Sequence, residues 1–179
     1  MSQPDTVFAG LLGAAFADLA APVRALHASD GPSCWQGQCV VSRGSHPLAR
    51  LCAWAARLPP AGQGVPTTVQ FQRRSDQEIW TRRFGAAAMR SRMWPHHGRL
   101  RERLGLVQFD FGLSVSNGGI AWNTLGVRVF GLLPLPAAWF SRVHCRESAD
   151  ALGRYTFDVQ ASLPWIGPVV RYQGWLLPG

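Results

Sequence analysis

The stretch from Val107 to Ser116 reads VQFDFGLSVS, and it decides the fold. Large apolar residues stand at every second position from Val107 to Val115, with small or polar residues between them. This period of two predicts a strand with one buried and one wet face, which is typical of antiparallel sheets. Asn117-Gly118-Gly119 follows at once, and Asn-Gly is the pair that two-residue hairpin turns prefer. The chain is therefore expected to turn back here into a neighbouring antiparallel strand.

The same period recurs through most of the chain after residue 65. Residues 155–163 alternate apolar and polar side chains, and Val69 and Phe71 alternate with glutamines before a turn at Ser75-Asp76. We expect an antiparallel meander over 65–177, with about nine or ten strands joined mostly by short turns. The sequence shows no alternation of strands with helices and no internal repeat.

Two segments before residue 65 follow a helical period instead. Residues 1–28 carry apolar side chains at helical spacing, with Asp5 or Thr6 as the N-cap and Pro22 as a point where the helix ends or restarts. A strand is expected over 34–43, and a second helix over 47–58 that Ser45 caps and Pro59-Pro60 stops. The expected buried stripe of this second helix consists of Leu48, Leu51, Cys52, Trp54, Ala55 and Leu58.

Together these elements predict one domain over 1–179, of α+β class and predominantly antiparallel β. A sheet with one apolar face must curl over something, either a helix or itself. The order of strand, helix and long meander favours a curved sheet or a calycin-like barrel or half-barrel. One helix lies at the N-terminus and one follows the first strand. This comparison rests on fold-level analogy.

The composition is that of a folded protein with an unusually basic surface. Of 179 residues 47% are hydrophobic and 16% charged, which excludes a disordered chain, and 8 tryptophans predict a filled core or a core around an apolar cavity. The net charge of +8 comes from arginine alone, and nine of the 18 arginines lie between Arg73 and Arg103. Such a face can attract nucleic acid, anionic lipid or an acidic protein, but a solvated face is the favoured interpretation. Nucleic acid ranks last, because no recognition motif accompanies the arginines.

Cysteines and the N-terminus indicate a reducing compartment. Four cysteines are irregularly spaced, without a CxxC pair or zinc-finger histidines, so we expect buried thiols and no metal site. No glycine-rich nucleotide loop occurs, and no cofactor is predicted. The N-terminus lacks the basic region of a signal peptide, and its apolar run from Val7 to Ala17 is too short to span a bilayer. We therefore expect a cytoplasmic protein without a transmembrane segment.

A series of short motifs between Val65 and Leu176 resembles a bacterial family of unknown function. They are EIWTRRFG (78–85), Ser91, ERLG (102–105), LPLP (133–136), FDV (157–159), LP (163–164) and VRYQGWL (170–176). The chain departs from that family's pattern at Ala86, where a second glycine is usual. Members of the family occur alone or C-terminal to saccharopine-dehydrogenase-like domains, so the resemblance implies a possible dehydrogenase-like partner. It implies no activity and no catalytic residue.

The segment from Glu78 to Phe84 is the first candidate site. In a strand, Glu78, Trp80, Arg82 and Phe84 share one face, which then mixes an acid, a base and two aromatic rings. If this face points inward, the charges must be paired, and the pair can orient a polar head group in an apolar cavity. The favoured alternative is an exposed cross-strand salt bridge with Trp80 covering an arginine stem.

The candidates for acid or base chemistry are Glu102, Glu147 and His144. The two glutamates alternate with apolar neighbours, so both are expected to point inward, where two carboxylates could act as an acid/base pair. Surface salt bridges to arginines are the favoured alternative. Ser91, between Met89 and Met93, is interpreted as a core serine because no nucleophile motif surrounds it.

The apolar stretch from Gly131 to Phe140 is expected to be a connector, because Pro134 and Pro136 bar it from a central strand. It is a candidate lip over a cavity, dimer contact or membrane-touching tip. Packing across the end of a barrel is slightly favoured over these.

Three functions remain open from the sequence. The first is a binding module for a small apolar or amphipathic ligand, which Trp80, Phe84 and Ser91 help to enclose and which Glu78, Arg82 and Tyr172 contact through polar groups. The second is an isomerase or hydrolase that uses Glu102 or Glu147 as its base. The third is an accessory domain of the dehydrogenase-like partner. A binding role without catalysis is the favoured one.

Overall fold

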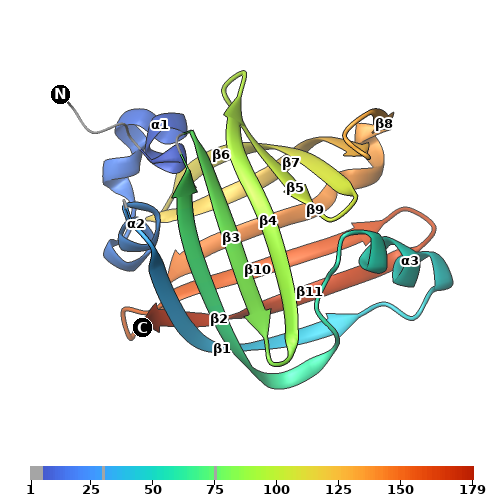
Figure 1. The fold of residues 1–179 in the computed structure, drawn as a ribbon, viewed down its shortest axis with the longest axis horizontal. Coiled ribbons are helices and arrows are strands. Elements are labelled where there is room, and N and C mark those ends of the chain that lie inside the picture. The colour runs from blue at the N-terminus through green and yellow to red at the C-terminus, as the bar shows by residue number, and fades with distance from the viewer. Residues whose placement is uncertain (1–5, 30, 75) are drawn as a thin grey trace.

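The protein is a closed antiparallel β-barrel in a computed structural model that describes residues 6–29, 31–74 and 76–179 (Figure 1). Eleven strands form one sheet in the order β6-β5-β4-β3-β2-β1-β11-β10-β9-β7-β8, and pairing of β6 with β7 closes the wall. The strands are β1 (Ser33–Arg43), β2 (Gly62–Arg74), β3 (Gln77–Phe84), β4 (Ala87–His96), β5 (Arg99–Leu104), β6 (Val107–Ser116), β7 (Gly119–Val129), β8 (Leu133–Leu135), β9 (Arg142–Ala149), β10 (Tyr155–Leu163) and β11 (Gly167–Pro178). The prediction of a calycin-like barrel is thus confirmed.

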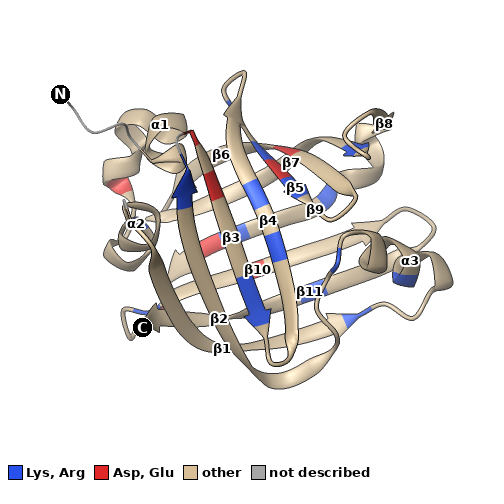
Figure 2. Cartoon of the chain, viewed as in Figure 1, with Lys and Arg blue, Asp and Glu red and all other residues tan. Residues whose placement is uncertain are grey.

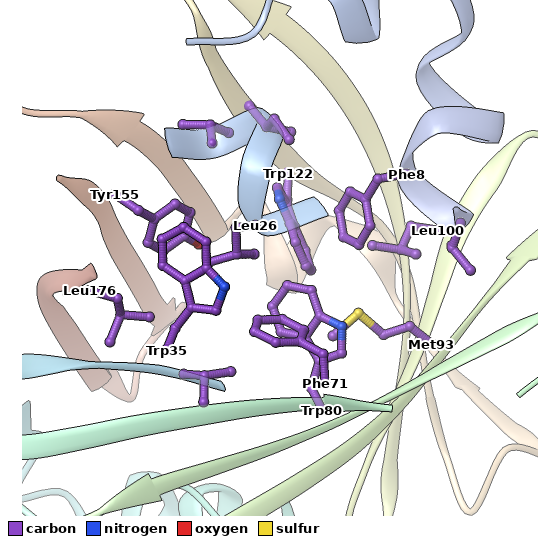
Figure 3. Packing of buried hydrophobic residues seen from close by; sticks show 14 of the residues in the cluster. Phe8, Leu26, Trp35, Phe71, Trp80, Met93, Leu100, Trp122, Tyr155 and Leu176 are labelled. Atoms are coloured by element: carbon purple, nitrogen blue, oxygen red, sulfur yellow. The ribbon is translucent and has the colours of Figure 1, made fainter. Parts of the chain in front are cut away.

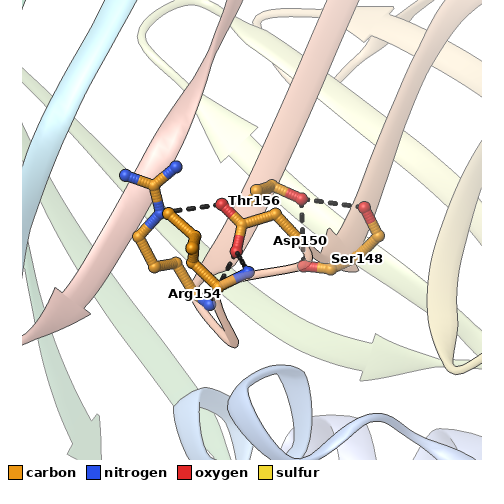
Figure 4. Close-up of polar contacts among 5 residues, drawn as sticks. Ser148, Asp150, Arg154 and Thr156 are labelled. Atoms are coloured by element: carbon orange, nitrogen blue, oxygen red, sulfur yellow. Dashed lines mark hydrogen bonds and ion pairs between the residues drawn. The ribbon is translucent and has the colours of Figure 1, made fainter.

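Turns place the strands as the sequence predicts, but the alternation within β6 is interrupted. Gln108 and Asp110 of its expected wet face are buried, and the register with β7 shifts between Asp110 and Phe111. Asn117 and Gly118 adopt φ of 50° and 74°, the left-handed pair that a tight hairpin between β6 and β7 requires. The β9–β10 turn is held by Asp150, whose carboxylate accepts the backbone N–H groups of Leu152 and Arg154 and pairs with the Arg154 side chain at 2.7 Å (Figure 4). The predicted strand over 34–43 begins one residue earlier, and the meander begins at Gly62.

The wall bends sharply where β1 pairs with β11, and glycine makes the bend possible. A Cβ atom on Gly37 would lie 1.9 Å from the carbonyl oxygen of Trp175, and one on Gly174 would lie 2.1 Å from that of Gln38. Only glycine fits such close backbone approach. The two strands thereby carry the sheet from the front of the barrel round to its back (Figure 1).

The N-terminal segment is three short helices rather than one. They are α1 (Val7–Leu12), the 3-10 helix η1 (Gly13–Asp18) and α2 (Ala21–His27). Thr6 caps α1 by accepting a hydrogen bond from the Ala9 N–H, while Asp5 lies outside the described residues. Gly13 then takes φ 55° and ψ −131°, which ends the α-helix early, and Pro22 starts α2. The segment is therefore helical and restarts at Pro22 as expected, and the break at Gly13 is the feature that the sequence pattern did not predict.

These helices cover one end of the barrel, which we call the plug end. Helix α1 contacts β4, β5 and β6, and α2 contacts β9 and β10. Phe8 and Val23 are fully buried and pack with Trp80 and Trp122 in the main core cluster (Figure 3). Burying such large side chains supplies most of the favourable free energy of folding.

The helix α3 (Pro47–Ala55) lies at the opposite end, and three details of its prediction are wrong. His46, not Ser45, is the N-cap, and its Nδ1 accepts a hydrogen bond from the Leu48 N–H. The helix ends three residues early because Arg57 adopts a left-handed φ of 53°. Leu58 then donates its N–H to the Ala53 carbonyl, as in a Schellman cap.

The third error concerns the buried face of α3. Ala49 and Ala53 are buried against β11, whereas Leu48, Leu51 and Trp54 of the predicted stripe are 50%, 56% and 69% exposed. Small residues let the helix lie close to the barrel, and its large apolar residues therefore face outward.

The connector between Gly131 and Phe140 also departs from its favoured interpretation. It forms β8, which among the described strands pairs only with β7 and so tolerates Pro134, and the 3-10 helix η2 (Ala137–Phe140). Phe140 is buried, but Leu132 and Leu133 are exposed. Leu132 and Leu133 therefore do not pack across the end of the barrel, whereas Leu135 is half-buried.

Candidate functional site

A cavity of about 80 Å³ lies inside the barrel. Strands from all around the wall line it, and Leu26 of α2 closes it from the plug end. Most of the lining is apolar or aromatic. The polar groups in the lining belong to Thr67, Arg82, Glu102, Trp122, His144, Cys145, Glu147, Tyr155 and Tyr172.

Arg82 is the cation in this wall. Its side chain is 11% exposed and lies over the Trp80 ring, 4.7 Å from the ring centroid. One N–H group donates to the Ser91 hydroxyl at 2.8 Å. Both terminal nitrogens approach the same Glu102 oxygen, each at 3.4 Å, which is longer than the 2.7–2.9 Å that is typical of a strong charged hydrogen bond. Arg82 thus keeps donor capacity.

Electrostatics keep this guanidinium charged and the nearby hydroxyl neutral. Burial lowers the pKa of Arg82, but negative groups, Glu102 foremost, outweigh burial and raise it. Burial raises the pKa of the Tyr172 hydroxyl, and Arg82 offsets only part of that rise. Tyr172 therefore stays protonated, and its hydroxyl makes no hydrogen bond to another described residue.

Glu147 lies in the same wall and belongs to a second buried pair. Its Oε2 lies 2.5 Å from His27 Nε2, and both side chains are almost wholly buried. The Phe8 ring covers the imidazole with 3.8 Å between ring centroids. Burial, followed by the charge of Glu147, raises the pKa of Tyr155 and of Cys145 well above their usual values. Neither group is therefore an anionic nucleophile at neutral pH.

Glu78, which was expected to contact a ligand, lies outside the cavity and binds the start of α1. Its two oxygens accept hydrogen bonds from the Val7 backbone N–H and the Trp80 indole, each at 3.1 Å. Glu78 is buried but does not line the cavity. This carboxylate instead fastens the start of α1 to the barrel, beside the helix N-terminus where a negative charge is favourable.

The structure thus brings most predicted site residues together and separates a few. Trp80, Arg82, Phe84 and Tyr172 line the cavity, and Ser91 holds Arg82 in place. Glu102 and Glu147 also line it, which the inward interpretation predicted, and neither forms the surface salt bridge that was favoured. His144 is exposed because it alternates with the inward Cys145, so it reaches the cavity lining without burying its side chain there.

Sequence reasoning missed His27, Trp122 and Tyr155. His27 stands four residues after Val23 on the apolar face of α2, which is a signal that it points inward. Trp122 is buried in β7, and its indole nitrogen has no hydrogen-bond partner within the described residues. An unpaired buried donor of this kind is costly, so it is a natural contact for a bound acceptor.

Comparison with known proteins identifies a family match but no activity. A family model described as a domain of unknown function (DUF4166) matches residues 19–176. No curated protein matches the chain. Among the described residues, none of the helices is long and apolar enough to cross a membrane.

Proposed function

Since the chain belongs to the family described as a domain of unknown function (DUF4166), we propose its function from the site alone: a binding module for a small amphipathic ligand. The observation that carries the proposal is a charged Arg82, with long hydrogen bonds to Glu102, in the wall of a mostly apolar cavity. Ligand sites of this kind combine an apolar lining with a few polar groups that fix orientation.

The donors in the wall favour an acceptor as the head group. Arg82 is a cation, the Tyr172 hydroxyl is protonated, and the Trp122 indole N–H has no partner among the residues that the structure describes. A carboxylate satisfies such donors best, because charge-assisted hydrogen bonds are roughly twice as strong as neutral ones. We propose a ligand with a short apolar body and a carboxylate head directed at Arg82.

The size of the cavity limits that body. An engineered apolar cavity of about 150 Å³ in another protein binds benzene. A cavity of about 80 Å³ suits a smaller molecule, or one end of a longer chain after side chains such as Met89 rearrange.

The test is calorimetric titration with short straight-chain carboxylates and the matching alcohols, after native mass spectrometry of the purified protein. Arg82→Met is expected to weaken carboxylate binding by about tenfold to a hundredfold, because one charged hydrogen bond is lost, and to leave alcohol binding unchanged. Arg83→Met, at the exposed next position of β3, is the matched control. Tyr172→Phe removes one donor without leaving Glu102 unpaired. A protein that carries no ligand and binds no carboxylate overturns the proposal.

An acid/base enzyme is the second candidate, since Glu102 and Glu147 both line the cavity. Each is already engaged with a basic side chain, which favours binding over catalysis. Glu102→Gln and Glu147→Gln should abolish turnover of a bound ligand if this candidate is right, and leave the ligand unchanged in solution if it is wrong. The bacterial source, the cytoplasmic location and the dehydrogenase-like partner rest on the sequence and its resemblance, and they stay predictions.

A further inference from the structure

The end of the barrel opposite the plug carries large apolar side chains that no described residue covers. Leu48, Leu51 and Trp54 form a stripe along the outer face of α3, which we call the α3 stripe. Exposed apolar patches of this kind mark interaction surfaces.

The patch extends beyond α3 through contacts within the chain. The buried side of α3 packs against Leu163 and Ile166 at the β10–β11 turn, and Trp165 in that turn is 86% exposed. The Trp165 ring meets Trp139 of η2, with 6.3 Å between the centroids. Figure 1 shows α3, this turn and β8 on the same side of the molecule.

A basic groove of about 1260 Å³ lies beside the α3 stripe, and Trp54 lines it. Arg43 lines this groove with its side chain hydrogen-bonded to the carbonyls of Leu58 and Pro59. The groove is also lined by Arg57, Arg74, Arg90, Arg92 and Arg103, and no acidic residue is among its lining residues. None of these arginines forms an ion pair within the part of the chain that the structure describes. Figure 2 shows arginine on β4 and near α3 on this face. We call these five residues the groove arginines.

Two of the groove arginines repel each other. Arg92 and Arg103 are direct partners across the β4–β5 pair, with both side chains on the outer face. Like charges directly opposite each other on a sheet are destabilising. A bound anion removes that repulsion.

The segments that build this end carry no negative charge. The sequence has no Asp or Glu between Asp30 and Asp76, between Asp110 and Glu147, or after Asp158. These intervals contain α3, β8, η2 and the β10–β11 turn. The apolar patch therefore stands in a positive potential that is not locally neutralised.

We propose that this end docks on the surface of an anionic phospholipid bilayer. The α3 stripe enters the interface between headgroups and acyl chains, and the groove arginines bind lipid phosphates. An apolar face with flanking basic residues is the combination that holds amphipathic helices in a bilayer interface.

Other occupants fit less well. A symmetric dimer through this patch would bring the arginines of one copy, Arg50 and Arg57 included, against those of the other. Nucleic acid would pair with the arginines but gives the exposed leucines no apolar contact. The proposal does not depend on the cavity having a ligand.

The test is flotation of the purified protein with vesicles of phosphatidylcholine alone and of phosphatidylcholine mixed with phosphatidylglycerol. We expect binding to the mixed vesicles only, with a loss at high salt. The double variant Arg92→Gln/Arg103→Gln should bind about 25-fold more weakly, since each arginine near an anionic surface contributes about fivefold. The double variant Leu51→Ser/Trp54→Ser should bind at least about tenfold more weakly than the unaltered protein.

Matched controls lie outside the patch. Arg99→Gln and Leu152→Ser replace an exposed arginine and an exposed leucine that do not line the groove, and both should bind like the unaltered protein. Equal binding to both vesicle types, or unchanged binding of the two double variants, overturns the proposal. A dimer in sedimentation velocity that Leu51→Ser/Trp54→Ser dissolves also overturns it, as does preferential binding to a DNA duplex. Circular dichroism checks that each variant is folded.

Discussion

The two ends of this barrel use amphipathic helices in opposite ways. At the plug end, α1 and α2 bury Phe8, Val23 and Leu26 among tryptophans and fasten themselves through buried carboxylates. At the other end, α3 buries alanines and leaves its leucines and tryptophan outside. An amphipathic sequence pattern therefore identifies a helix but does not determine which face of it packs against the core. Large residues inside indicate a structural helix, and large residues outside indicate a surface for another molecule.

The largest difference between the ends should appear in stability. Phe8→Ala removes a fully buried ring and should lower the free energy of unfolding by about 4 kcal/mol. Trp54→Ala removes a larger but exposed ring and should change it by less than about 0.5 kcal/mol. Urea unfolding measures both. Equal losses would show that α3 supports the fold as strongly as the plug does.

A buried hydrogen bond between a carboxylate and an imidazole should contribute more than an exposed ion pair. Glu147→Gln replaces the carboxylate that holds His27 of α2, and we expect a loss of about 2 kcal/mol from the weakened charged hydrogen bond. Asp158→Asn alters a well-formed but exposed pair with Arg171, where the expected loss is at most about 1 kcal/mol. Thermal unfolding of the two variants at neutral pH ranks them. The reverse order would mean that the plug is not held by this pair.

The end of α3 offers a substitution that should stabilise. Arg57 is held at a left-handed φ of 53°, which glycine adopts without strain. Arg57→Gly should therefore raise the free energy of unfolding by about 1 kcal/mol. Arg50→Gly removes the same side chain from the interior of the helix and should cost about 1 kcal/mol, because glycine has a low helix propensity. The opposite signs separate backbone conformation from loss of charge. Destabilisation by both would contradict the assigned helix end.

The smallest expected effect is on the acid stability of the barrel wall between the two ends, where Asp110 lies in β6. Burial raises the pKa of Asp110, but the hydrogen bond and charge of Arg101, with Arg128, outweigh it and lower the pKa. The carboxylate therefore contributes stability above its unfolded pKa, and this contribution is lost as the pH falls through the lower folded value. When the free energy of unfolding is measured from neutral pH down to about pH 3, Asp110→Asn should make its fall with pH less steep. An unchanged fall would assign acid sensitivity to other carboxylates.

Alternation in the sequence predicted much of the barrel and the inward face of β3. The period of two fixes which side chains share a face, so Trp80, Arg82 and Phe84 could be grouped before their surroundings were known. The Asn117-Gly118 turn follows from backbone conformation alone. Partners across the fold could not be predicted, because they depend on tertiary packing: nothing local links Glu78 to the Val7 N–H or Glu147 to His27. The face of α3 was missed for the same reason, since tight packing of small residues outweighed burial of large ones.

The pairing of β1 with β11 also leaves one edge of β1 without its partner strand while the protein is being synthesised. Residues as far apart as Trp35 and Pro178 are partners across these two strands. During synthesis β1 leaves the ribosome well before β11 exists, so one edge of it must wait unpaired until the last strand emerges. Folds dominated by such distant pairings form slowly. A nascent chain of this protein is therefore expected to need shielding of that waiting edge, by a chaperone or by temporary contacts of its own.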